Sequence, residues 1–588
     1  MGVKMTRKRL LPLLLSIVTT ITCQSVWAVD ESGWIAPQFT PRFSDTATEN
    51  RIPLLRGDSL PASYGFTLDE DGRLIVEGQT PVRDQGINGA CWAFATMSAM
   101  EANMLQSGIV GESPDLSETH MIYSTSNYGA SDSDISNAEQ GYDTKPTDGG
   151  NLYYAASYLM RGTTLGGTLH ETDDPYLYED VKMPYRPIET TRELGEKRAY
   201  TVQNMPIITG EKSAAYGTQE LGAIKRAVMQ YGAVTSSLYW FDSASYYNKD
   251  TGAYYVPAMR DANHAITIVG WDDSYPAGNF ATEPEGDGAW LIKNSWGTGI
   301  GIDGSGYYWV SYYDGKIGEW TYAIDGVEAF DPKRIVHEYD YRIDGTISGC
   351  TSYVVAFPRE AEQERLDAVK VFLNAPAELV ISVCTDYKPG DAKNVADNAF
   401  EFAQTFRAER PGFYTIPLEQ PALVEGDCFA IRLDTDAQTA ELYTYDANTR
   451  PIIEEKGSEY GAVFMGMGDT NMWSEPRLRN GVYDLPCIKA VSSNLTENTY
   501  LEIIHATKCE EGFRVEIDTD MAKPIQLAAV SYREGQMSRI HLQEIELRGK
   551  RAEYLLPFPI EEGTRITVFA LSSDTFTPLT EKRTVTIE

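Results

Sequence analysis

The spacing of apolar residues changes along this chain, and the order of that change constrains the fold more than any other feature. Three early segments carry apolar residues at helical spacing, and a glycine follows shortly after each of them. They are residues 91–106, 151–161 and 219–231. Strand-like runs follow at 233–239, 264–270, 289–293 and 307–313. Helices followed by strands within one region predict an α+β fold.

From about residue 333 onward the pattern is strand-like throughout, with short runs separated by turns that contain Gly, Pro and Asp. In the first part of this region the runs lie at 351–357, 366–373, 378–385, 426–433 and 462–465, and in the second part at 500–505, 513–517, 525–532 and 565–571. A chain of 588 residues accommodates several domains of ordinary size. We therefore predict an α+β domain over 60–328, followed by two all-β, sandwich-like domains at 334–490 and 495–588.

The first 28 residues have the character of a secretion signal rather than of a folded domain. A basic stretch that ends at Arg9 precedes the apolar run 10–18, and residues 26–28 fit a signal-peptidase site. A membrane anchor is the alternative, but the apolar run is short for a bilayer span. We predict a signal peptide over 1–28, export to the cell surface or the medium, and no membrane span once the signal is removed.

Charge and cysteine content narrow the class of protein further. Asp and Glu number 85 against 50 Lys and Arg, a formal net charge of −35, which disfavours nucleic acid or an anionic membrane as the main partner. Of the seven cysteines, Cys23 would leave with the signal peptide and five lie beyond residue 340. This density is too low for a disulfide scaffold. Cys91 is therefore isolated in its part of the chain, and its presence needs an explanation.

Cys91 stands at the predicted start of the first helix, within the sequence PVRDQGINGACWAFA of residues 81–95. A thiol in that place lies near oriented backbone N–H groups and the positive end of the helix dipole, which favour its thiolate. The glycines before it, Gly89 among them, let a substrate approach the backbone closely. Gln85 supplies a side-chain amide that can donate to a developing oxyanion. A buried structural cysteine is the competing interpretation of Cys91 alone.

Two later segments supply the groups that a thiol nucleophile requires. Asn263 and His264 stand at the head of an apolar strand, and Asn294 ends another strand, with Trp296 two residues further on. A thiol needs a base to form a nucleophilic ion pair, and the base needs a third group that holds its ring. A lone histidine at a strand start is more often structural. Three such segments in this order favour nucleophilic catalysis by Cys91, His264 and Asn294.

These segments resemble the papain-like cysteine peptidases, and the resemblance covers about residues 60–325. Weaker similarities lie at 115–118, at 149–150 and at 171–176. The resemblance implies a two-lobed fold, with a helical lobe and a β-barrel lobe. It also implies hydrolysis of peptide bonds in proteins or peptides through a thioester, without a metal ion or a cofactor.

The same resemblance assigns roles to individual residues. Cys91 would be the nucleophile, His264 its proton partner, and Asn294 the group that orients the imidazole. Gln85 would complete the oxyanion hole, and Trp296 would shield the bond between His264 and Asn294 from water. The substrate-binding positions that the resemblance implies are Gly149, Gly150, Gly89, Asn263 and Trp296. The backbone of the glycine pair would hold a substrate in an extended conformation.

The chain departs from the family in three respects. Asn88 stands where the family usually carries a cysteine that is bridged to a later one, so that bridge is absent. The intervals from the predicted nucleophile to its partners exceed the roughly 130–150 residues typical of such enzymes. Insertions at 131–145 and 181–215 could account for this and would reshape the rim of the cleft. Residues 29–59, interpreted as a linker or a short propeptide, are too few for the long helical inhibitory segment of the plant and lysosomal enzymes.

Residues 334–490 resemble the lectin-like β domain that follows the peptidase in some bacterial secreted members of the family, and residues 495–588 resemble an immunoglobulin-like sandwich. These domains imply cell-wall or surface glycan as a partner. A spacer or a cleft wall is the favoured interpretation of 334–490, and a spacer is an equal interpretation of 495–588. Two other functions stay open: a surface-binding or adhesion protein, and a cell-wall amidase with Cys–His chemistry, which Gln85 disfavours. Scattered histidines and the acidic turns 271–273 and 303–306 give no sufficient reason to predict a metal site.

Overall fold

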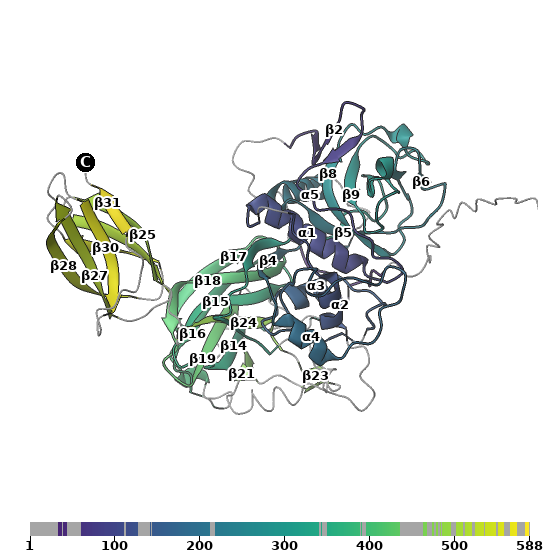
Figure 1. Ribbon diagram of the computed structural model, residues 1–588. Helices are drawn as coiled ribbons and strands as arrows, with labels where there is room; N and C mark the ends of the chain where they lie inside the picture. The colour runs from purple at the N-terminus through teal and green to yellow at the C-terminus, as the bar shows by residue number, and fades with distance from the viewer. Residues whose placement is uncertain are drawn as a thin grey trace, which may run out of the picture.

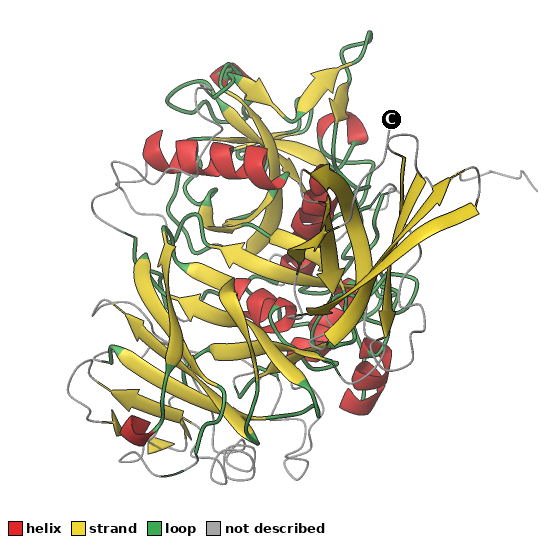
Figure 2. Cartoon of the chain, turned by 90° about the vertical axis from the view of Figure 1, so that its left-hand side faces the viewer, coloured by secondary structure: helices red, strands yellow, loops and turns green. Residues whose placement is uncertain are grey.

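The structure of the chain is a computed structural model (Figures 1 and 2). It describes residues 33–37, 39–43, 60–110, 113–126, 141–142, 144–211, 218–339, 343, 350–388, 390, 395–435, 463–466, 473–474, 478–479, 482–483, 485–495, 501–509, 512–519, 524–533, 536–547, 551–557, 565–572 and 583–586. The predicted signal peptide and the predicted insertion at 131–145 lie outside these residues, apart from 141–142 and 144–145. Within the described part of the chain, no helix is both long and apolar enough to cross a bilayer.

The helical lobe is built around α1 (Cys91–Ser107), which is buried along nearly its whole length. Small side chains along α1 allow other elements to approach it closely, and Gly108 ends it with a φ of 70°. The other helices of the lobe are α2 (Glu118–Thr125), α3 (Leu152–Leu159) and α4 (Ile188–Gly195). The side chain of Asn151 caps α3 by accepting hydrogen bonds from two backbone N–H groups, and Ser117 caps α2 in the same way.

The β lobe is an eight-stranded, mostly antiparallel sheet with the strand order β11-β5-β8-β9-β10-β7-β6, to which β1 adds by pairing with β8. Its strands are β1 (Ser63–Tyr64), β5 (Val234–Leu238), β6 (Tyr247–Asn248), β7 (Ala253–Tyr254), β8 (His264–Asp272), β9 (Ala289–Lys293), β10 (Tyr307–Ser311) and β11 (Glu319–Tyr322). Helix α5 (Thr218–Tyr231) contributes apolar residues to the core of this sheet. Every residue of β5, β9 and β10 is buried, so these strands consist of apolar, aromatic or small residues, except for Lys293 at the end of β9.

The next part of the chain is a sandwich of two six-stranded sheets. One sheet has the order β17-β16-β19-β14-β20-β21, and the other has the order β12-β4-β18-β15-β24-β13. The strands are β4 (Tyr200–Pro206), β12 (Asp325–Ala329), β13 (Arg334–His337), β14 (Ser352–Pro358), β15 (Glu364–Leu373), β16 (Ala377–Cys384), β17 (Glu401–Ala408), β18 (Gly412–Leu423), β19 (Cys428–Thr435), β20 (Val463–Gly466), β21 (Trp473–Ser474) and β24 (Ile488–Asn494). Because β4 and β12 come from the preceding α+β region, the second sheet joins the two parts of the molecule. Figure 1 shows β4 beside β18 at this junction.

The C-terminal part forms two antiparallel sheets, β25-β26-β29 and β28-β27-β30-β31, around an apolar core of its own. The strands are β25 (Leu501–Cys509), β26 (Gly512–Thr519), β27 (Pro524–Arg533), β28 (Gln536–Glu546), β29 (Ala552–Pro557), β30 (Arg565–Ser572) and β31 (Arg583–Thr586). Short pairs complete the described strands: β2 (Phe66–Leu68) with β3 (Leu74–Val76), and β22 (Leu478–Arg479) with β23 (Val482–Tyr483). The predicted order, an α+β region followed by all-β regions, agrees with this arrangement (Figure 1).

The three predicted helices and the predicted strands are present, with ends that shift by a few residues. The prediction for 307–313 was too long, because β10 ends at Ser311 and a turn follows. The sequence did not indicate α2 and α4. All eight residues of α2 are buried, so it has no polar face to reveal its period. Helix α4 is equally short and begins directly after Pro187.

Candidate active site

Cys91 is the first residue of α1 and is completely buried. The backbone N–H of Ala265, at the start of β8, donates a hydrogen bond to its Sγ at 3.3 Å. Burial raises the pKa of the Cys91 thiol to about 12, although the backbone N–H groups of Ala265, Trp92 and Cys91 itself act in the opposite direction. The sequence predicted a thiolate favoured by the helix start, but in this structure the desolvation of Cys91 outweighs that effect.

His264, which precedes Ala265, is held by contacts on its edge and on its face. Its Nε2 lies 2.9 Å from Asn294 Oδ1, and the indole of Trp296 stacks on the imidazole at 4.4 Å with an interplanar angle of 16°. Strands β8 and β9 are antiparallel neighbours, so the start of β8 lies beside the end of β9. This pairing is what brings His264 and Asn294 together. The predicted role of Trp296, to shield the bond between His264 and Asn294 from water, stays a prediction.

Gln85 links the loop before α1 to the segment that follows β9. Its Oε1 accepts a hydrogen bond from Ser295 Oγ at 2.6 Å, and its Nε2 donates to the carbonyl of Asn88 at 2.9 Å. A backbone bond from Gln85 N–H to the Ser295 carbonyl, at 2.8 Å, fixes the same junction. The side chain is thus immobilised next to the residue that follows Asn294. Its predicted role as an oxyanion donor stays a prediction.

Four of the five predicted substrate-binding residues, Gly89, Gly149, Gly150 and Asn263, lie against a segment of the chain itself, residues 33–35, whereas Trp296 stacks on His264. Trp34 pairs with Gly150 as a one-residue parallel bridge, in which Gly150 N–H donates to Gly33 and Ile35 N–H donates to Gly150, both at 3.0 Å. The N–H of Trp34 also donates to the carbonyl of Asn263 at 3.3 Å. The structure therefore brings Gly150 and Asn263 to the two sides of one extended backbone.

Glycines make this close approach feasible. Gly33 has a φ of +95°, and a Cβ on it would lie 2.2 Å from a backbone atom of Gly89. Gly149 has a φ of +110°, and a Cβ there would lie 2.2 Å from the carbonyl oxygen of Gly33. A Cβ on Gly150 would meet the ring of Trp92 at 2.6 Å. The same physical reason therefore requires glycine at the predicted sites Gly89, Gly149 and Gly150. Another backbone or an aromatic ring lies so close to each of them that a Cβ would collide with it.

The same N-terminal segment continues towards the junction with the β sandwich. The ring of Phe39 stacks on Tyr153 of α3 at 4.3 Å, and Tyr153 Oη donates to the carbonyl of Phe39 at 3.1 Å. Further on, the N–H of Arg42 donates to the carbonyl of Asn374, directly after β15, at 2.7 Å. The described part of residues 29–59 is thus anchored at both ends, by Gly150 and Asn263 at one end and by Asn374 of the sandwich at the other. No pattern in the sequence indicates these contacts.

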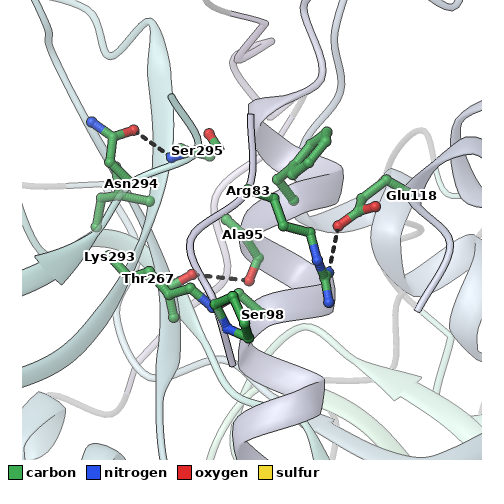
Figure 3. Close-up of a pocket in the computed structure, with 12 residues that line it drawn as sticks. Arg83, Ala95, Ser98, Glu118, Thr267, Lys293, Asn294 and Ser295 are labelled. Atoms are coloured by element: carbon green, nitrogen blue, oxygen red, sulfur yellow. Dashed lines mark hydrogen bonds and ion pairs between the residues drawn. The ribbon is translucent and has the colours of Figure 1, made fainter. Parts of the chain in front are cut away.

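A buried cluster of charges lies beneath the site and was not predicted. The guanidinium of Arg83 pairs with Glu101 at 2.7 Å, with Asp115 at 2.6 Å and with Glu118 at 3.0 Å. Figure 3 shows Arg83 and Glu118 on one side of a small cavity, with Lys293 and Asn294 on the other. The cavity has a volume of about 20 Å³, room for one water molecule.

The buried groups of this cluster have shifted pKa values. Burial raises the pKa of Glu118 to about 7, although Arg83 opposes the shift. Burial lowers the pKa of Lys293, whose Nζ donates to Thr80 Oγ1 at 2.8 Å, to about 8. The sequence signals that could have pointed to this cluster are Arg83 within the segment around Cys91 and Glu118 within the segment at 115–118.

Asn88, which replaces the expected cysteine, fixes the start of the second predicted insertion by hydrogen bonds instead. Its Nδ2 donates to the carbonyls of Tyr178 at 2.7 Å and Val181 at 2.9 Å, and its Oδ1 accepts from the N–H of Met183 at 3.0 Å. The residue is only 1% exposed. One side chain therefore performs locally the anchoring that a disulfide would perform.

We expect Asn88→Ala to lower the stability of the peptidase region by about 2–3 kcal/mol, because three backbone groups, one of them buried, lose their partner. The measurement is the thermal midpoint followed by the helical circular dichroism signal, since the described α-helices all lie between residues 91 and 231. Asn248→Ala, which removes one bond to the Asn279 carbonyl and one from the exposed Asp250 N–H, is the matched control. Equal effects of the two substitutions would contradict the anchoring role of Asn88.

A hollow of about 360 Å³ adjoins the face of Trp296. Aromatic residues that line it include Trp240, Tyr247 and Tyr308, and its charged side chains are Asp242, Asp250, Asp303 and Lys249. Asp303 has a φ of 51°, a conformation that few residues other than glycine adopt. Sequence reasoning missed this hollow because its residues come from four separate loops and strands. Among the described residues, no group of three or more His, Cys, Asp or Glu side chains could hold a metal ion.

Residues 71–321 match the family model described as papain family cysteine protease. Procathepsin L of Felis catus is 29% identical over 227 residues, which are 38% of this chain and 55% of that protein. A cathepsin L-like peptidase of Aedes aegypti is 28% identical over 228 residues, which are 38% of this chain and 54% of that protein. The chain thus spans about half the length of the curated relatives it matches.

Two solved structures of a clostridial cysteine protease, Cwp84, have a similar fold. Cwp84 after propeptide cleavage has a TM-score of 0.52 at 22% identity, covering 71% of this chain and 97% of that one. The cysteine protease and lectin-like domains of Cwp84, described as a surface layer associated protein of Clostridium difficile, have a TM-score of 0.52 at 21% identity, covering 75% and 90%. These similarities confirm the predicted fold class, a papain-like region followed by a β domain.

Proposed function

We propose that the chain, whose residues 71–321 match the papain family of cysteine proteases, is an exported cysteine endopeptidase that uses Cys91, His264, Asn294 and Gln85. The observation that carries the proposal is the dyad geometry: Asn294 holds His264 Nε2 at 2.9 Å beneath Trp296, and the next residue after His264 contacts the thiol. The hydrogen bonds from Gly150 and Asn263 to an extended backbone support a peptide as the substrate.

The proposed reaction has two halves. The Cys91 thiol transfers its proton to His264 and its sulfur attacks the peptide carbonyl, while the Gln85 amide and the backbone N–H of Cys91 stabilise the oxyanion. His264 then gives the proton to the departing amine, and a thioester remains. Water, deprotonated by His264, attacks the thioester, and the proton returns to the sulfur as the acid product leaves. Asn294 keeps Nε2 occupied, so Nδ1 is the ring nitrogen that exchanges the proton.

We also propose that residues 33–43 act as a short propeptide that keeps the enzyme latent. Residues 33–35 occupy the backbone-binding positions that a substrate would need, and the thiol beneath is completely buried. Phe39 and Arg42 fix the segment beyond the cleft. A short segment held by glycine contacts would thus replace the long helical propeptide of other family members. Export, the signal peptide and a surface location like that of Cwp84 belong to the same proposal.

The decisive experiment is covalent labelling by an irreversible epoxide inhibitor of thiol peptidases, read by mass spectrometry, together with cleavage of a peptide library. The protein is used both as the full chain and as a form that begins at Leu60, so that latency does not conceal activity. We expect stoichiometric labelling of the shorter form at Cys91 and none in Cys91→Ala. The absence of labelling and of cleavage in the shorter parent form would refute the proposal. A surface-binding role for the β domains, with glycan as partner, stays a prediction that the Cys91→Ala variant would leave intact.

Gln85→Ala should lower kcat by roughly a hundredfold or more, because an oxyanion donor is removed. KM should change little, since the donor acts mainly on the transition state. Gln85→Glu, which keeps the shape and the contact with Ser295, separates loss of the donor from loss of structure. Gln106→Ala, at the exposed end of α1, is the matched control and should behave as the parent does. A near-normal kcat in Gln85→Ala would refute the assignment.

The hollow next to Trp296 predicts a preference for the residue that follows the cleaved bond. His264 protonates the departing amine, so the hollow beside its ring is placed to receive that residue. Aromatic faces, and three carboxylates against the single ammonium of Lys249, favour Lys or Arg there. We expect peptides with Lys at this position to be cleaved about three to ten times faster than matched peptides with Glu, given the exposure of the acids. Asp303→Asn should reduce this ratio, whereas Asp71→Asn, in a distant exposed turn, should not; an unchanged ratio in Asp303→Asn would contradict the assignment.

A further inference from the structure

The sheet that joins the peptidase region to the β sandwich contains a gap in its pairing. Strands β4 and β18 pair only at Pro206 with Gly412 and at Met205 with Phe413. Beyond these residues a cavity of about 170 Å³ opens, several times the space that one water molecule requires. It lies between β4 of the peptidase region and β15 of the sandwich. Neither Cys91 nor His264 lines it.

Lys370 of β15 lines this cavity although it is only 7% exposed. Its neighbours Val369 and Val371 point into the core of the sandwich, so its own side chain lies on the opposite face of the strand, towards the peptidase region. Its Nζ makes one long hydrogen bond, 3.5 Å to the carbonyl of Val202. Among the residues that the structure describes, no carboxylate lies within ion-pair distance of it.

A second lysine, Lys489, takes up the negative charge that lies near Lys370. Lys489 of β24 lies directly opposite Lys370 in the strand pairing, and like charges in that position repel. Lys489 has a counter-charge, because its Nζ pairs with Glu338 at 2.8 Å. The other oxygen of Glu338 is taken by the backbone N–H groups of Gly162 and Thr163. Burial lowers the pKa of Lys370 to about 8, with Glu338 opposing the shift, so the ammonium still predominates at pH 7.

The acidic residues at the cavity wall are already engaged. Glu328 pairs with Arg334 at 2.9 Å, Asp367 pairs with Arg365 at 2.5 Å, and Asp331 accepts a hydrogen bond from the backbone N–H of Lys333 at 2.9 Å. The guanidinium of Arg198 also lines the cavity and donates to the Gly162 carbonyl at 2.7 Å, which adds positive charge to the same wall. Burial of an ammonium without a counter-charge costs free energy, because the group loses its hydration. An anion bound in the cavity next to Lys370 would offset this cost.

The rest of the wall decides what kind of anion fits. Phe330, Val336 and Val491 present apolar surface to the cavity, and Thr415 is bonded to the Gln203 carbonyl. We propose that this cavity binds a small monocarboxylate with an apolar body, aliphatic or aromatic, whose carboxylate pairs with Lys370 Nζ. Such a ligand would bridge the peptidase region and the sandwich. The proposal is independent of the peptidase chemistry, because no residue of that site takes part.

The test measures the thermal midpoint of the full-length chain with benzoate, with hexanoate, with benzyl alcohol and with inorganic phosphate. We expect each carboxylate to raise the midpoint by about 2–4 °C at saturation, since a ligand that binds only the folded state stabilises it by mass action. Benzyl alcohol, which has the body without the charge, and phosphate, which has the charge without the body, should have little effect. The effect of the carboxylates should decline above pH 8 as Lys370 loses its proton.

Lys370→Met removes the ammonium and keeps most of the volume of the stem, so the response to benzoate and hexanoate should vanish. Lys388→Met, at a fully exposed lysine in the same sandwich, should leave the response intact. Isothermal titration of the two variants separates loss of binding from a change in stability. Equal responses in Lys370→Met and the parent, or a response to phosphate alone, or no response to either carboxylate, would overturn the proposal.

Discussion

A form that begins at Leu60 is expected to react with iodoacetamide at Cys91 at least about 100 times faster at pH 7 than the full chain does. The thiolate is the reacting species, and burial raises the pKa of the Cys91 thiol to about 12 in the covered state. A thiol with a pKa of about 12 is thiolate to only ~0.001% at pH 7, whereas one near the ordinary value of about 8.5 is thiolate to ~3%. Exposure of the cleft restores hydration, so it lowers the pKa and raises the reactive fraction.

The rate is measured residue by residue, by mass spectrometry of peptides after timed alkylation. Cys384, which is buried at 5% exposure in β16, supplies an internal control, because its surroundings do not include residues 33–43. Its rate should be the same in both forms. Equal rates at Cys91 in the two forms would contradict the covering role of the N-terminal segment.

A single substitution tests the same idea without truncation. Gly33→Ala introduces a Cβ that would lie 2.2 Å from the backbone of Gly89, at a φ of +95° that L-residues rarely adopt. The segment should leave the cleft, and Cys91 should react as in the shorter form. Gly72→Ala is the matched control, because Gly72 also has a positive φ but has nothing within 4 Å of the added Cβ. Slow alkylation of Cys91 in Gly33→Ala would show that the cover does not depend on this contact.

The sequence predicted those parts of the site that local patterns determine. The helix that begins at Cys91 and the strand that begins at His264 each follow from residue spacing within one element. The approach of His264 to Asn294 then follows from the antiparallel pairing of two strands that are close in sequence. These elements needed no knowledge of distant residues, and the structure has them at the predicted places.

The remaining features depend on contacts between residues that are far apart in the chain. The pairing of Pro206 with Gly412 creates the shared sheet, and no pattern near either residue reveals the other. The segment 33–35 is too short to show a period, and its position depends on Gly89 and Gly150. The anchoring by Asn88 is equally non-local, since it joins the loop before α1 to residues 178–183. Such contacts follow from the assembled fold rather than from propensity.

Replacement of Arg83 by Met is expected to destabilise the peptidase region by about 3–5 kcal/mol, because it leaves buried carboxylates without their counter-charge. Glu101 and Glu118 both have fully buried side chains, and each is within 3.0 Å of the guanidinium. The urea midpoint of the helical circular dichroism signal measures the loss. Lys197→Met breaks a largely exposed pair with Asp173 and should cost less than about 1 kcal/mol. Similar losses in the two variants would mean that the cluster contributes no more than a surface ion pair.

The loss in Arg83→Met should also depend on pH, with a sign that the pKa of Glu118 determines. Burial raises this pKa to about 7, and Arg83 opposes the shift, so the variant should have a still higher value. A carboxyl whose pKa is higher in the folded than in the unfolded state binds more protons when folded, so stability rises as the pH falls from the folded value towards about 4.5. The free energy of unfolding that Arg83→Met loses relative to the parent should therefore be largest at pH 8 and much smaller at pH 5. A deficit of equal size at both values would mean that lost packing of the Arg83 stem, rather than uncompensated charge, is the cause.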